Sequence, residues 1–225
     1  MEMSTLNHQV IADRLTQDRL ASYLAATAGD VHASIDLYDW NTQVGAALYE
    51  DLGRLEVIFR NAIDAALVTH GQTRGWQDVW YRQRQLFSGR PGRRAWDDIE
   101  SARKRATRRS KTEVHGKVVA ELNFGFWRFL CTPHYLTSLW VPALASAFPG
   151  HHDAGDPRRV RADVDDRMQR LHFLRNRIAH HEPIHQRNLA HDHGELLDIV
   201  GWICADSHTW VGSVTRTLAV IGDRP

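Results

Sequence analysis

The chain has 225 residues with 28 basic and 27 acidic side chains, and its net charge of +1 offers no overall attraction for nucleic acid. Its length suits one domain with a core of its own, and eight tryptophans among 43% hydrophobic residues exclude wholesale disorder. Only two cysteines are present, Cys131 and Cys204, which disfavours a disulfide framework or a cysteine-based zinc site.

Helical periodicity runs through nearly the whole chain, and no stretch shows the strict alternation of a β-strand. Apolar spacing, glycines and prolines predict helices, in chain order, over residues 15–25, 35–68, 76–86, 93–109, 110–130, 137–148, 157–181 and 195–221. Loops are expected at residues 88–92 and 149–156, which are rich in glycine and proline. The predicted fold class is therefore an all-α bundle, a single domain over residues 1–225.

Two of these helices have additional support in the sequence. The helix over residues 35–68 carries an apolar stripe that steps by three and four residues: Leu48, Leu52, Leu55, Phe59, Ala62 and Ala66. The helix over residues 157–181 has Asp156 as its N-cap and Pro157 in its first turn. Pro183 disfavours helical backbone at Glu182, so this helix should end near residue 181.

Neither a membrane nor a metal ion is an expected partner. No apolar run reaches the ~20 residues of a membrane span and no signal-peptide pattern is present, so a cytoplasmic location is expected. Six of the 14 histidines lie between residues 172 and 193, but Pro183 separates His181 from His185 and breaks the helix that would align them. We therefore expect no metal and no other cofactor.

The charge is unevenly distributed along the chain. Residues 90–117 contain ten bases and four acids, a net charge of +6, while the other 197 residues carry −5. Such a basic block is typical of a surface that binds the phosphate backbone of nucleic acid. It also fits a solvated helix face paired with the acidic residues 1–64, which have a net charge of −6. The RNA-binding candidates in this block are Arg103, Lys104, Arg105, Arg108, Arg109 and Lys111.

The polar stretch at residues 174–184 has the side chains for phosphodiester chemistry. RNA carries its own nucleophile, the 2′-OH, so a protein needs a base, an acid and a cation to cleave it. Histidine suits the first two roles and arginine suits the third. At ~100° per residue, Arg175 lies about 40° from the centre of the apolar stripe, and Asn176 and His180 lie about 140° and 180° away.

Arg175 and His180 therefore point about 140° apart on a straight helix and do not converge on one phosphate. Either the helix distorts near Pro183, or a second copy of the chain supplies groups across a dyad. We favour a homodimer whose two facing helices supply two arginines and two histidines, because symmetric dimers are the commonest oligomers.

Arg175-Asn176-Arg177-Ile178-Ala179-His180 matches the R-N-x-x-x-H motif of HEPN-domain ribonucleases. The longer context resembles the Abi-like (AbiD/AbiF) branch of that superfamily, which is linked to abortive phage infection in bacteria. The matching segments are residues 37–41, 55–63, 116–117, 121–127, 139–140, 148–149 and 175–184, with Trp202. The resemblance covers about residues 10–215.

The resemblance implies a HEPN-type helical bundle with additional helices that dimerises. Arg175 and His180 match the catalytic pair, and Asn176 matches the polar residue after the arginine. Metal-independent endoribonuclease activity through 2′-OH attack would then serve a toxin or antiphage effector, with an antitoxin or regulatory RNA as a further partner. The alternative is a non-catalytic HEPN protein that binds RNA as a scaffold in an antiphage ribonucleoprotein.

Five further residues are candidates to support this pair. Glu56, Arg60 and the weaker candidate Asn61 lie on the predicted helix over residues 35–68. They are expected either to support the Arg175/His180 cleft or to belong to an ordinary surface ion ladder. His181 and Glu182 are expected either to tune His180 or to be exposed to solvent.

Overall fold

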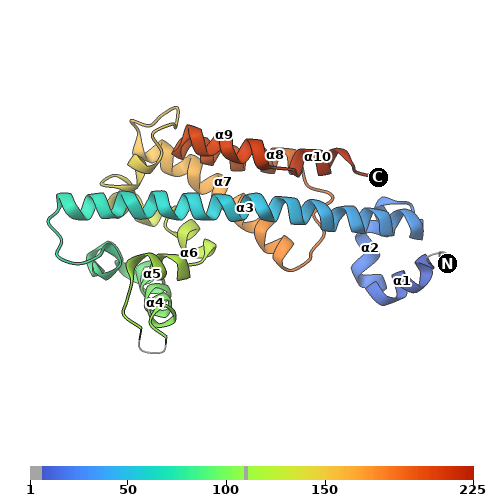
Figure 1. Ribbon diagram of the computed structural model, residues 1–225, viewed down its shortest axis with the longest axis horizontal. Coiled ribbons are helices and arrows are strands. Elements are labelled where there is room, and N and C mark those ends of the chain that lie inside the picture. Colours follow the sequence, from blue (N-terminus) through green and yellow to red (C-terminus); the bar gives the residue numbers. More distant parts are fainter. Residues whose placement is uncertain (1–6, 109–110) are drawn as a thin grey trace.

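The computed structural model describes residues 7–108 and 111–225, and every regular element in those ranges is a helix (Figure 1). The predicted all-α class is confirmed. The α-helices are α1 (His8–Leu15), α2 (Gln17–Ala26), α3 (Val31–Thr73), α4 (Gly89–Ala106), α5 (His115–Glu121), α6 (Phe124–Phe129), α7 (Pro157–Ala179), α8 (Leu189–Ile203), α9 (Ala205–Val214) and α10 (Thr217–Gly222). Within the described ranges, no helix combines the length and apolarity needed to cross a bilayer.

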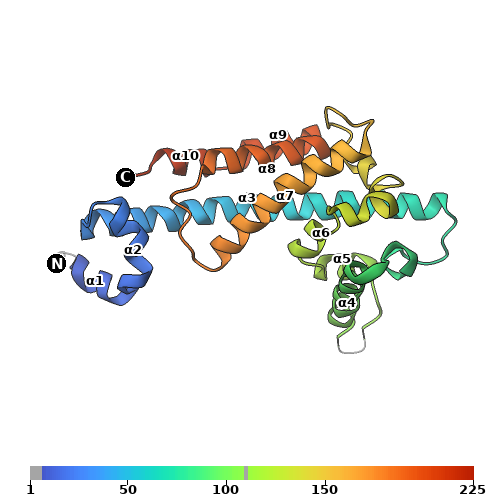
Figure 2. The same ribbon diagram turned by 180° about the vertical axis from the view of Figure 1, so that it is seen from behind.

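Helix α3 is the axis of the molecule. Its 43 residues extend beyond the predicted range at both ends, and the Asp30 side chain caps it by accepting the N–H of Ala33 at 3.0 Å. The predicted stripe is buried, with Leu48, Leu55 and Phe59 at most 1% exposed. Helices α8–α10 lie along one side of α3, α4–α6 lie on the other, and α7 crosses it obliquely (Figures 1 and 2).

The apolar side chains form two clusters along α3. The larger one surrounds its C-terminal half and takes side chains from α4 to α9. The smaller one surrounds its N-terminal half and includes Trp40 and Leu174. Ile178, near the end of α7, packs against both clusters. The segment with the R-N-x-x-x-H motif therefore lies where the two clusters meet.

The beginning of α7 agrees with the sequence. The Asp156 side chain accepts the N–H groups of Arg158 and Arg159, and Pro157 occupies the first turn. The helix ends at Ala179 with His180 as its C-cap, close to the predicted end.

Two of the long helices predicted from periodicity are interrupted. The expected helix over residues 110–130 is wrong, because α5 ends at Glu121 and Asn123 caps a new helix, α6, by accepting the N–H of Phe126 at 2.9 Å. Ser110, its expected first residue, lies outside the described ranges. The expected helix over residues 195–221 is three helices. It breaks at Cys204, whose backbone is extended, and at Thr215, whose hydroxyl donates to Asp51 on α3.

Two shorter segments also differ from expectation. Residues 76–86 form two 3₁₀ turns, Trp80–Arg82 and Arg84–Leu86, instead of an α-helix. Pro142 interrupts the expected helix over residues 137–148, which becomes a π turn, Leu136–Trp140, and a 3₁₀ turn, Leu144–Ala147.

The expected loop at residues 88–92 is instead the start of α4. Gly92 is needed there because a Cβ would lie 2.3 Å from the carbonyl carbon of Phe87. Helix α1 and the break after it at Thr16 (φ +70°) were not predicted.

Asp51 joins α3 to the C-terminal helices through a buried hydrogen-bond network. Its Oδ2 accepts the hydroxyls of Thr215 at 2.5 Å and Thr217 at 2.6 Å, and the His193 ring lies 3.4 Å away. Burial raises the pKa of this carboxyl, but the hydrogen bonds and the nearby His193 outweigh burial and lower the pKa to about 2.

We predict that Asp51 makes unfolding depend on pH in the acidic range. Because its pKa is lower in the folded state, it contributes about 2 kcal/mol above pH ~4. This contribution is lost as the pH falls from about 4 toward 2, where the folded carboxyl becomes protonated. Chemical unfolding of Asp51→Asn should therefore show a lower stability at pH 6 and a shallower loss of stability below pH ~4. The control is Asp39→Asn, an exposed residue on the same helix; equal slopes for both variants would contradict the prediction.

Candidate functional site

The motif residues lie on the last two turns of α7. Arg175 and Asn176 are half-buried, whereas His180 is exposed at the C-cap. Arg175 lines a cavity and His180 does not, but Asn176, which the helix-angle calculation placed near His180, lines the cavity with Arg175. Within the described ranges, one chain therefore does not bring the side chains of Arg175 and His180 to a common cavity.

A left-handed turn ends α7 directly after His180. His181 has φ +55°, its N–H donates to Ile178 O at 3.0 Å, and the N–H of Glu182 donates to Arg177 O at 2.8 Å. These two bonds form a Schellman motif, in which the left-handed position is usually glycine. The predicted supporting residues His181 and Glu182 thus direct the chain away from His180, and their side chains are exposed.

Side chains of α7 and α2 hold this turn in place. Arg177 donates to Pro183 O through Nε at 3.1 Å and Nη2 at 2.6 Å, and it forms an ion pair with Glu182 at 3.1 Å. Arg19, on α2, donates from Nη1 to His181 O at 2.7 Å. Hydrogen bonds from Arg177 and Arg19 therefore hold the backbone that directly follows His180.

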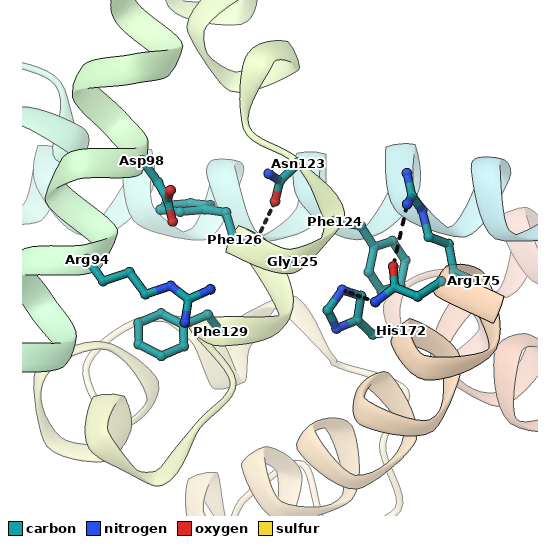
Figure 3. A pocket seen from close by; sticks show the side chains of 10 residues that line it. Arg94, Asp98, Asn123, Phe124, Gly125, Phe126, Phe129, His172 and Arg175 are labelled. Atoms are coloured by element: carbon teal, nitrogen blue, oxygen red, sulfur yellow. Dashed lines mark hydrogen bonds between the residues drawn. The ribbon is translucent and has the colours of Figure 1, made fainter. Parts of the chain in front are cut away.

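A cavity of about 340 Å³ opens between α4, α6 and α7 (Figure 3). It is lined by Arg94, Asp98, Asn123, Phe124, Gly125, Phe126, Phe129, His172, Arg175 and Asn176. Figure 3 shows Arg94 on one side, His172 and Arg175 on the other, and Gly125 between them. Its size is within the range of small-ligand sites.

His172 lines the cavity and was not among the site residues predicted from the sequence. Its Nε2 lies 3.2 Å from Asn176 Nδ2, and because an amide nitrogen only donates, Nε2 accepts and the ring proton is on Nδ1. The Asn176 Oδ1 in turn accepts from Arg175 Nη1 at 3.5 Å. The spacing of His172, Asn176 and His180 at successive steps of four residues places them along one face of α7, which was the available signal.

The surroundings of His172 favour its neutral form. Burial lowers the pKa of this imidazole, and the charges of Arg128 and Arg175 lower it further. Its ring also stacks on Phe124, with the ring centroids 5.7 Å apart. Because Nε2 already accepts from Asn176, the neutral imidazole can donate a hydrogen bond from Nδ1–H to an oxygen atom, such as that of a hydroxyl group.

The predicted supporting residues on α3 differ in position. Burial raises the pKa of the Glu56 carboxyl, while the charges of Arg175 and Arg60 act in the opposite direction. Glu56 therefore lies near enough to Arg175 for their charges to interact. The Arg60 Nε is buried and has no hydrogen-bond partner among the described residues. Asn61 is exposed and does not line the cavity.

The basic segment contributes to the site less than its charge predicts. Arg103 is bound by Glu100 at 2.6 Å and Glu113 at 2.9 Å, and Arg105 is bound by Glu121 at 2.7 Å. These ion pairs favour the structural interpretation for those two arginines. Lys104, Arg108 and Lys111 are exposed, and Arg109 lies outside the described ranges. From the same segment, Arg94 reaches the cavity over the Phe129 ring at 5.5 Å.

The other C-terminal histidines do not converge. His185 stacks on Tyr23 at 4.7 Å, His191 lies 3.4 Å from Glu195, and His193 binds the Asp51 network. Elsewhere, the ligand atoms of His151, His152 and Asp163 lie within 4.8 Å of one another.

The His151/His152/Asp163 group is arranged for a hydrogen bond more than for a metal. His151 Nδ1 accepts the N–H of Asp153 at 3.0 Å, which places the ring proton on Nε2, facing Asp163 Oδ2 at 3.1 Å. A metal bound at Nε2 requires the opposite tautomer.

Comparisons of the chain with protein-family models, with curated proteins and with solved structures found no match in any of the three.

We predict that His181→Gly preserves or raises the stability of the protein by up to about 1 kcal/mol, since glycine adopts the left-handed conformation without a steric penalty. His181→Val should lower it, because a β-branched residue is strongly disfavoured there. Denaturant unfolding of both variants measures the difference. A glycine variant less stable than the valine variant would show that the side chain of His181, and not its backbone, determines stability.

We predict that His172 is neutral at pH 7 and titrates below the ordinary histidine pKa of 6.5. Removing a nearby positive charge with Arg175→Ala should move this pKa toward 6.5, whereas Arg158→Ala, at the exposed start of the same helix, should not. NMR titration of the imidazole carbons measures both effects. A pKa of 6.5 or higher in the unmodified protein would contradict the burial of this ring.

Proposed function

We propose that this protein is a HEPN-type endoribonuclease that acts as a toxin or antiphage effector of abortive infection. The observation that carries the proposal is the presentation of the R-N-x-x-x-H motif: Arg175 lines a cavity, and His180 is exposed one turn further along α7. No described carboxylate lies within 4.0 Å of the Arg175 guanidinium, and Glu56 interacts with its charge only at longer range, so the guanidinium can still donate to a phosphate.

The proposed reaction is transesterification at phosphorus. A base takes the proton of the 2′-OH, O2′ attacks the adjacent phosphorus, and the bond from phosphorus to the 5′-oxygen breaks. An acid protonates that leaving oxygen, so the products carry a 2′,3′-cyclic phosphate and a 5′-OH. His180 serves as base or acid and Arg175 stabilises the negative charge of the phosphorane, which is chemistry that requires no metal ion.

A composite dimer site supports this chemistry better than a single chain. Arg175 and His180 of one chain face different directions, and a phosphate needs both within hydrogen-bond reach. Two copies related by a dyad would place the exposed His180 of each chain beside the α7 of the other. The exposed Lys104, Arg108 and Lys111 are the remaining candidates for backbone contacts, and an antitoxin or regulatory RNA would hold the activity in check.

One observation favours a second function, a non-catalytic RNA-binding scaffold. In the described chain Arg175 faces the cavity with Asn176 and His172, while His180 lies outside it. Such an arrangement can bind a phosphate without cleaving it. Salt-dependent RNA binding with no cleavage products would favour this function over the first.

We predict that His180→Ala and Arg175→Ala each lower RNA cleavage at least about 100-fold, because each removes a group that acts on the transition state. The measurement is single-turnover cleavage of labelled RNA, with mass spectrometry of the 2′,3′-cyclic phosphate ends. Cleavage should persist in a chelator and should stop when the 2′-OH at the cut site is replaced by hydrogen.

The matched controls are His208→Ala and Arg158→Ala, which remove an exposed histidine and an exposed arginine elsewhere. Mixing the Arg175→Ala and His180→Ala chains tests the composite site, since a mixed dimer retains one arginine and one histidine. It should cleave faster than either parent. Undiminished cleavage by either single variant would refute the assignment, and full activity in a monomer would refute the dimer.

A further inference from the structure

We propose that the cavity between α4, α6 and α7 binds one unpaired, phosphorylated nucleotide of an RNA strand, with its phosphate between Arg94 and Arg175. This inference rests on RNA as the substrate in the proposed function. It adds a binding subsite whose residues come from α4 and α6, outside the R-N-x-x-x-H motif.

The charge of the cavity walls fits a phosphate. Arg94 enters from α4 and Arg175 from α7, on opposite sides of the space (Figure 3). Neither guanidinium has a carboxylate within 4.0 Å among the described residues, unlike Arg103 and Arg105 on the same basic segment. Asp98 is the one acid in the lining, and burial raises the pKa of its carboxyl while the charge of Arg94 acts in the opposite direction.

The wall that carries His172 fits the sugar of the same nucleotide. His172 is neutral and half-buried, and Asn176 fixes its orientation by donating to Nε2. A ribose hydroxyl and a phosphate belong to the same nucleotide. A nucleotide whose phosphate lies between Arg94 and Arg175 can therefore place a ribose hydroxyl beside the His172 imidazole. The Phe124 ring lies roughly parallel to the imidazole, with the ring centroids 5.7 Å apart.

Gly125 keeps this space open. A Cβ at this position would lie 3.2 Å from Asn123 Oδ1 and 3.5 Å from His172 Nε2, at the centre of the cavity lining. The residue is within α6 and has no positive φ, so the backbone does not require glycine here, and a side chain would press on the cavity lining.

The neighbouring hollows favour a strand over a free nucleotide or inorganic phosphate. On one side a hollow of about 560 Å³ shares Arg94 and Phe129 with the cavity and adds Arg90 and Arg93. On the other side a hollow of about 610 Å³ shares His172 and Asn176 and adds Arg128. A chain of nucleotides can leave the cavity past Arg90 and Arg93 on one side, and on the other past Arg128, which pairs with Asp165 at 3.7 Å.

The test is equilibrium binding of a short, labelled single-stranded RNA to the full-length His180→Ala protein. In this variant the proposed cleavage is slowed at least about 100-fold. Adding Arg94→Ala should weaken binding at least about tenfold at constant salt, because a charged contact to phosphate is lost. Gly125→Ala should do the same without changing the charge, because it fills the space, and alanine is compatible with the helix. Arg158→Ala is the matched charge control on α7 and should change binding less than about twofold.

Competitors distinguish the ligand. The unlabelled strand should compete best, a nucleoside monophosphate more weakly, and inorganic phosphate or a duplex of the same sequence least. Binding within twofold of the parent for both Arg94→Ala and Gly125→Ala would overturn the proposal, as would equal competition by inorganic phosphate. Failure of the proposed function is separate, because it would appear as intact RNA with the unmodified protein while the effects of Arg94 and Gly125 on binding remain.

Discussion

The packing of helix α3 sets the position of every group in the candidate site. Leu48, Leu52, Leu55 and Phe59 form one buried stripe along it, and the helices on both of its sides bury their apolar faces against that stripe. Helix α7 crosses α3 where the two clusters meet, so the direction of its last turns is determined by Leu174 and Ile178. Arg175, which lies beside these core positions, lines the cavity, whereas His180 is exposed at the C-cap where α7 has ended.

The helices that could be predicted from the sequence are those whose signals are local. The stripe of α3 and the Asp156–Pro157 cap of α7 depend on neighbouring residues and were predicted close to their observed bounds. The breaks depend on distant partners. Thr215 interrupts the C-terminal helix by binding Asp51, 164 residues earlier in the chain, and periodicity contains no information about such a partner.

The candidate site likewise has one part that could be predicted from the sequence and one part that could not. The separation of Arg175 and His180 follows from ~100° per residue and required no structure. The cavity did not follow from the sequence, because Arg94 and Gly125 reach His172 only through the packing of α4 and α6 on α7. Asn123 caps α6 and Gly125 lies beside His172, and neither position follows from the spacing of residues along the chain.

The charge of the basic segment shows why a net count is a poor guide to binding. Arg103 and Arg105 face the carboxylates of Glu100, Glu113 and Glu121, so their charges stabilise the contact of α4 with α5 and attract little else. Arg94 belongs to the same segment but lines the cavity, and among the described residues no carboxylate lies within 4.0 Å of its guanidinium, although Asp98 lines the same cavity. An arginine contributes to anion binding when its fold position leaves its charge uncompensated, and only the three-dimensional arrangement decides which arginines those are.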